Sequence, residues 1–165
     1  MQHDRRTILD GLVVGLIGYA AVALFYSVFD LLASRGPLYT VNLLGKAVFR
    51  GLRDPSVLMF AQDYDLSAIF AYNALHLAVA LLIGLVATTV VGIAERTSSR
   101  AGLVRIVIVA GFIITVTIVG ALTTPIRPLL PMWSVVATNA LAAIIAGVYL
   151  LRRRPGLWHK LVLAS

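Results

Sequence analysis

Four long apolar stretches, separated by more polar segments, dominate the pattern of hydrophobic and polar positions along the chain. They cover residues 8–33, 67–94, 103–124 and 132–151. Each reaches about 20 residues or more, and a helix of that length crosses the roughly 30 Å hydrocarbon core of a bilayer. Helices are expected because lipid cannot satisfy the polar groups of an open backbone. The pattern predicts an all-α membrane protein with four transmembrane helices, folded as a single domain over residues 1–165.

The only long connection, residues 34–66, carries a helical pattern of its own. Polar side chains recur at i, i+4, i+8 and i+11, while apolar ones form an opposite stripe of Val41, Leu44, Val48 and Leu52. The polar stripe consists of Asn42, Lys46, Arg50 and Arg53. We expect a short amphipathic helix that lies on the outer membrane surface, with Lys46, Arg50 and Arg53 at the lipid headgroups. The alternative is a helix that docks a partner without contacting lipid. The other notable connection, residues 123–131, has three prolines and predicts a stiff, extended crossing.

Composition narrows the class of protein. Hydrophobic residues make up 60% of the chain and charged residues only 13%, against roughly 25% charged in ordinary soluble domains. This excludes a disordered chain and almost any soluble globular domain, because too few polar side chains exist to coat a water-facing surface. The chain has no cysteine, which excludes disulfides and cysteine-ligated metals. The net charge of +7 is assigned to contacts with anionic phospholipids, and no nucleic-acid partner is expected.

The basic residues predict the orientation in the membrane. Nine of them flank the two termini and the connection between the second and third spans, and five lie on the other side. Because cytoplasmic segments carry the excess of Lys and Arg, we expect both termini in the cytoplasm and residues 34–66 on the outer side. Arg152, Arg153 and Arg154 follow the fourth span, where they are expected at the lipid interface.

His76 is the sharpest candidate for chemistry, because ionisable residues inside a membrane are costly and point to function. Tyr72 and Asn73 precede it by one helical turn. One reading is an axial ligand of haem b, although the spans contain no second histidine. Another is contact with a quinone or a proton relay. The third alternative is a purely structural role, in which a neutral imidazole is hydrogen-bonded between helices with Asn73 or Asn139 as its partner.

The glycines and two aspartates of the spans are expected to have structural roles. Small residues let helix backbones approach closely, so helix packing is expected at Gly11, Gly15, Gly18, Gly84 and Gly111. Asp10 lies in the first turn of its span, where a carboxylate suits the helix dipole. Asp30 is expected to be solvated or paired with Arg35 at the interface. The sequence has no nucleophile elbow, zinc-protease motif or phosphate loop, so no enzyme activity and no metal site are expected.

Two segments carry a resemblance to a known group. Arg35-Gly36-Pro37-Leu38-Tyr39-Thr40 is followed by Leu43-Leu44-Gly45 and Ala47-Val48-Phe49, and the next span holds Tyr72-Asn73-x-x-His76. This resembles a loose family of uncharacterised small bacterial four-helix integral membrane proteins, which have a similar glycine- and proline-containing loop and a Tyr–His span. The order Arg-Gly-Pro and the presence of Val41, where proline is frequent, depart from that pattern. The resemblance covers about half of the chain and implies an architecture without a mechanism.

These observations favour a non-catalytic accessory subunit of a larger complex in the bacterial inner membrane, with respiratory or photosynthetic electron transfer as the expected setting. Its partners would be larger integral membrane subunits, phospholipids and a periplasmic domain docked on residues 34–66. It would have no cofactor of its own, apart from a lipid or quinone at a subunit interface. Two alternatives stay open: a small oligomeric channel or transporter lined by Asn73, His76, Thr115 and Asn139, and a haem- or quinone-binding subunit that uses His76.

Overall fold

The computed structural model describes residues 2–60, 63–96 and 101–154, and these parts contain helices and turns but no strand. In chain order the elements are α1 (Gln2–Leu32), α2 (Tyr39–Phe49), α3 (Pro55–Phe60), α4 (Leu66–Arg96), α5 (Ala101–Leu122), the 3-10 turn η2 (Thr124–Ile126) and α6 (Met132–Arg153). Helices α1, α4, α5 and α6 are each long and apolar enough to cross a membrane. The prediction of four such helices is confirmed, and the chain is a multi-pass membrane protein.

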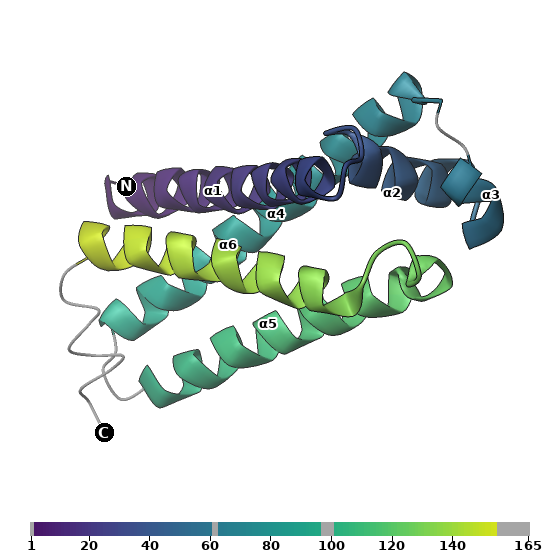
Figure 1. The fold of residues 1–165 in the computed structure, drawn as a ribbon. Coiled ribbons are helices and arrows are strands. Elements are labelled where there is room, and N and C mark those ends of the chain that lie inside the picture. Colours follow the sequence, from purple (N-terminus) through teal and green to yellow (C-terminus); the bar gives the residue numbers. More distant parts are fainter. Residues whose placement is uncertain (1, 61–62, 97–100, 155–165) are drawn as a thin grey trace.

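The four long helices lie side by side, with α2 and α3 gathered at one end (Figure 1). We call this the α2 end, and the opposite end, where α1 begins and α6 finishes, the Asp10 end. Helix α1 is central because it packs extensively on α4 and also on α6. Helix α5 makes far fewer contacts with its neighbours α4 and α6. The molecule therefore consists of a tight α1–α4–α6 group and a loosely attached α5.

Glycines explain the close contact between α1 and α4. A Cβ atom added at Gly15 would lie 2.6 Å from the Cα atom of Leu81, and one at Gly11 would lie 2.9 Å from that of Leu85. Gly84 faces the backbone of Gly11 and Gly15 from the other side. The two backbones thus meet where neither carries a side chain, which is the packing expected for small residues in a membrane. Gly18 and Gly111, also predicted to pack, have no neighbour among the described residues within 4 Å of an added Cβ.

A compact apolar core lies at the α2 end. It joins α2 and α3 to the segment between α5 and α6, and its buried members are Leu43, Leu44, Leu58, Ile126, Leu129, Leu130 and Val135. Away from this core, large apolar side chains of the long helices point outward. This distribution suits a protein whose helices face hydrocarbon, because lipid offers no hydrophobic drive to bury them.

The proline-rich connection before α6 does not form the extended crossing expected from its sequence. Residues Thr124–Ile126 form a 3-10 turn with Pro125 near its start, and Ile126 is only 1% exposed. The fixed φ of proline suits the first residues of a helical turn as well as an extended segment. Burial of Ile126 and Leu130 in the core at the α2 end decides between these two conformations.

The connection between α1 and α4 contains α2 over Tyr39–Phe49. Its polar stripe does not point away from the protein: Asn42 is 5% exposed and Lys46 is 8% exposed. Both side chains are bonded to the segment that leads into α4, whose backbone groups they satisfy. Arg50 and Arg53 follow the helix and are exposed. The sequence periodicity thus predicted the two faces of α2. Part of the polar face is buried against the segment that leads into α4.

Candidate functional site

A cluster of tyrosine, asparagine and histidine side chains lies between α1 and α4, inside their membrane-spanning segments. The hydroxyl group of Tyr19 on α1 donates a hydrogen bond to Oδ1 of Asn73 on α4 at 3.0 Å. The Asn73 amide donates in turn to the backbone carbonyl of Ile69, also at 3.0 Å. A paired amide is the expected state of such a group in hydrocarbon, since an unpaired one is costly there. Asn73 is therefore committed to holding the two helices together.

His76 lies one turn further along α4, close to two aromatic rings. The centre of its ring is 5.2 Å from that of Tyr19 and 6.1 Å from that of Tyr72. The side chain is half-buried. Neither ring nitrogen makes a hydrogen bond within the described part of the chain, and neither is fully enclosed by protein. The interhelical hydrogen bond expected with Asn73 or Asn139 is thus not formed, because those amides are bonded to backbone carbonyls of their own helices.

Helix α6 contributes further hydroxyl groups on the side of α1 that faces it. The hydroxyl oxygen of Tyr26 lies 3.4 Å from that of Ser134. The Thr138 hydroxyl, one turn further along α6, is fully buried and has no hydrogen-bond partner among the described residues. Tyr72 packs against the core at the α2 end together with Tyr26. These hydroxyl, amide and imidazole groups of α1, α4 and α6 thus lie in the half of the bundle nearest the α2 end.

Asp30 fixes the position of α2 relative to α1. Its carboxylate is 1% exposed and accepts two hydrogen bonds of 2.7 Å, from the backbone N–H and from the hydroxyl group of Thr40. Thr40 lies in the first turn of α2, where backbone N–H groups lack partners within the helix. A carboxylate is favoured there by charge and by hydrogen bonding. Asp30 is therefore a buried cap for another helix, rather than the solvated interfacial carboxylate that its position near the end of a span indicated.

Arg35 closes the turn between α1 and α2. Its guanidinium group lies over the ring of Tyr39 at 4.7 Å and donates to the carbonyl oxygen of Leu129 at 3.4 Å. This arginine connects the start of α2 with the segment before α6. Together with Asp30 it fixes the α2 end against the bundle.

The segment that enters α4 is bonded to α2 and the residue that follows it. The Lys46 ammonium group donates to the backbone carbonyl of Asp63 at 2.6 Å, and Asn42 accepts from the N–H of Asp65 at 2.9 Å. Arg50 forms a salt bridge of 2.8 Å with the Asp65 carboxylate. Hydrogen bonds from Arg50, the Ala68 N–H and Ser67 hold the pKa of Asp65 well below its usual range. The α2 end therefore carries a connected polar cap over the bundle, defined as the described residues within 30–67, which are 30–60 and 63–67.

At the Asp10 end, a buried ion pair links the first and last long helices. The Asp10 carboxylate receives two hydrogen bonds from Arg154, at 3.1 Å from Nε and 2.9 Å from Nη2. Arg153 lies 3.7 Å away and the Tyr149 hydroxyl 3.5 Å away. Arg154 is only 8% exposed, so it does not reach out to lipid headgroups as its place in the basic run indicated, whereas Arg152 and Arg153 are exposed. Because partners 144 positions apart leave no local pattern, sequence reasoning missed this pair.

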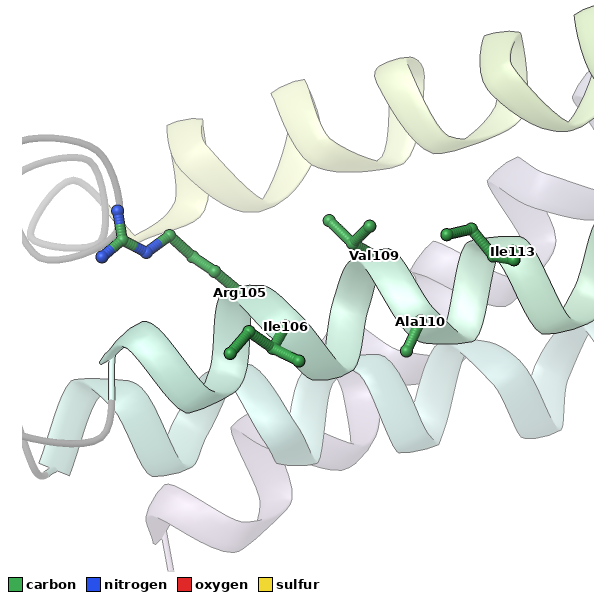
Figure 2. A pocket seen from close by; sticks show the side chains of 5 residues that line it. All are labelled: Arg105, Ile106, Val109, Ala110 and Ile113. Atoms are coloured by element: carbon green, nitrogen blue, oxygen red, sulfur yellow. The ribbon is translucent and has the colours of Figure 1, made fainter.

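Helix α5 carries a shallow apolar surface hollow with an arginine at one end. Its lining consists of Arg105, Ile106, Val109, Ala110 and Ile113, all on α5 (Figure 2). The figure shows the guanidinium group of Arg105 pointing towards the end of α6, while the apolar side chains follow the helix. Ile106, Val109 and Ile113 are each more than half exposed. This strip is one open face of α5; Ile114 and Ile118, on another side of the helix, are also more than half exposed.

Comparison of the chain with protein-family models, with curated proteins and with solved structures finds no match. The described residues contain no group of three or more histidine, cysteine or acidic side chains that could hold a metal ion. Of the predicted candidates, Tyr72 and His76 lie together, and Asn73 is joined to Tyr19. Tyr19 escaped sequence reasoning because nothing local connects it with residues 54 positions later.

Proposed function

We propose that this protein is a non-catalytic accessory subunit of a larger complex in the bacterial inner membrane, and that respiratory or photosynthetic electron transfer is the setting of that complex. Helix α5 carries the proposal. It is one of four membrane-crossing helices, yet it packs only loosely on α4 and α6 and leaves the strip of Figure 2 open. A transmembrane helix of a larger subunit could pack along this strip, since van der Waals contact drives helix association in lipid.

The cap over residues 30–67 supports the same role. Its buried polar groups are used in holding the cap to the bundle: Asp30 binds Thr40, and Lys46 and Asn42 bind the segment that enters α4. A segment fixed by so many contacts presents a constant surface, which lowers the entropic cost of binding a partner. On the predicted orientation this surface would face the periplasm and could dock a periplasmic domain.

The polar side chains that a small channel would need form separate hydrogen bonds with different partners. Asn73 is bonded to Tyr19, while Thr115 and Asn139 donate to carbonyl groups of their own helices at 2.8 Å. Within the described residues these side chains form no shared hydrogen-bonded path. Transport activity is therefore treated as an outcome that would overturn the proposal.

The test is purification of the tagged protein from its native membrane in mild detergent, followed by native gel electrophoresis, mass spectrometry and visible absorbance. We expect stoichiometric co-purification of larger electron-transfer subunits. Val109→Trp places a bulky side chain in the open strip and should weaken recovery of those subunits about tenfold, a loss of roughly 1.4 kcal/mol. Val107→Trp is the matched control, because Val107 is also exposed but points to nearly the opposite side of α5.

Three results would contradict the proposal. The first is a homo-oligomer that purifies without other subunits. The second is ion or solute flux into liposomes that contain only this protein. The third is equal recovery of partner subunits with Val109→Trp and with the wild-type chain, which would remove the open strip from the interface.

A further inference from the structure

The depth of His76 restricts what can pair with its imidazole. The apolar segment of α4 spans 28 residues, Leu66–Ile93, or about 42 Å of helix, which exceeds the hydrocarbon core by roughly 6 Å at each end. His76 follows Leu66 by ten residues, or about 15 Å. For an upright α4 centred in the bilayer, His76 lies roughly 9 Å inside the hydrocarbon, below the level of phospholipid headgroups. Water and lipid phosphates do not reach this depth.

The imidazole at this depth has an unused capacity for hydrogen bonding. A neutral imidazole carries one N–H donor and one acceptor nitrogen. Neither nitrogen is hydrogen-bonded within the described part of the chain, and Asn73, the nearest amide on the same helix, is committed elsewhere. Polar groups in hydrocarbon are costly without a partner. A molecule that dissolves in the membrane and offers a carbonyl or hydroxyl oxygen would supply one.

The surroundings of the imidazole favour a flat ring with an apolar tail. The aromatic rings of Tyr19 and Tyr72 lie within about 6 Å of the imidazole and are tilted by 52° and 37° to it. Aromatic groups interact best with other rings in such tilted or offset arrangements. Along α4, residues at i+3, i+7 and i+10 from His76 share its side of the helix. These are Val79, Ile83 and Val86, whose side chains are 45%, 45% and 55% exposed. They form a continuous apolar stripe leading away from the imidazole.

We propose that His76 is the hydrogen-bonding anchor of a binding site for an isoprenoid quinone, with the quinone ring beside Tyr19 and Tyr72 and the tail along Val79, Ile83 and Val86. The imidazole N–H donates to a quinone carbonyl oxygen. This inference concerns this chain alone and does not depend on the accessory role, so the two can fail separately.

The experiment uses the purified full-length protein in detergent with decylubiquinone as the probe. The chain has three histidines, so ¹⁵N-labelled histidine gives few imidazole signals, and the His76→Gln spectrum assigns that of His76. We expect saturable binding that shifts the His76 signal and leaves the other two unchanged. His76→Phe keeps a ring but loses the hydrogen bond, and it should weaken binding about tenfold, the equivalent of roughly 1.4 kcal/mol. His3→Phe is the control and should bind as the wild type does.

His76→Gln guards against misfolding, because its side-chain amide can still donate to a carbonyl. We expect this variant to retain most of the affinity that His76→Phe loses, at equal thermal stability. The inference is overturned if decylubiquinone leaves the His76 signal unchanged at saturation, or if His76→Phe binds it as tightly as the wild type. It is also overturned if the purified protein shows a Soret band that His76→Phe abolishes, because the imidazole would then be a haem ligand.

Discussion

Asp10 and Asp30, near the two ends of α1, each hold a distant part of the chain. Asp10 binds Arg154 beyond the end of α6, and Asp30 binds Thr40 in the first turn of α2. Both carboxylates are buried, at 6% and 1% exposure. A buried charge is costly without a partner and strongly bound with one. These two residues therefore determine where both ends of α1 are fixed.

Asp10→Asn removes the carboxylate from the buried pair but keeps the size of the side chain. Arg154 then stays buried without this counter-charge, and we expect the free energy of unfolding to fall by about 3 kcal/mol. The measurement is an SDS titration of the protein in detergent, followed by circular dichroism. Asp63→Asn is the control, because the Asp63 side chain is exposed and the bonds that Asp63 forms with Asn42 and Lys46 go to its backbone carbonyl. Equal midpoints for Asp10→Asn and the wild type would show that the pair adds nothing to stability.

The long helices differ in how firmly they are held. Helices α1 and α4 touch backbone to backbone at Gly11, Gly15 and Gly84, whereas α5 has an open strip and few contacts. The sequence predicted helix packing at all of these glycines, and at Gly18 and Gly111 as well. It could not tell which of them lie in a contact, because the rotational position of a helix is set by all of its neighbours. The amphipathic pattern of α2 likewise located two faces without showing which one is buried.

Two alanine substitutions on the same helix test the α1–α4 contact. Gly15→Ala places a Cβ 2.6 Å from the Leu81 Cα atom, so the helices must separate, and we expect a loss of about 1–3 kcal/mol of stability. Gly18→Ala meets no described atom within 4 Å and should be neutral, or stabilising by up to about 1 kcal/mol through helix propensity. The same SDS titration measures both, and equal effects of the two changes would contradict this assignment of the contact.

The two ends of the molecule differ in construction. The α2 end has an apolar core and a polar cap, while the Asp10 end is held by an ion pair. In Figure 1 the α2 end and the Asp10 end lie at opposite ends of the long helices, so they should face opposite sides of the membrane. The excess of basic residues beside the termini predicts that the Asp10 end is cytoplasmic.

Because the chain has no cysteine, single substitutions can report this orientation directly. We expect a membrane-impermeant maleimide to label Ser56→Cys from the outer side of intact spheroplasts. Arg152→Cys should react only after the membrane is opened. Both positions are exposed, so the accessible side alone decides the outcome. Labelling in the reverse order would mean that the charge rule fails for this protein.

The sequence by itself determined the fold class, because four runs of apolar residues of bilayer length leave a helix as the only way to pair the backbone. It also located His76 and Tyr72, since a polar group in an apolar run stands out without knowledge of its partners. Only the tertiary structure decided that Asp10 meets Arg154, that Lys46 and Asp30 are buried, and that Tyr19 rather than His76 is bonded to Asn73. These contacts join residues on different elements, so they depend on how the helices are rotated and stacked, which no local pattern encodes.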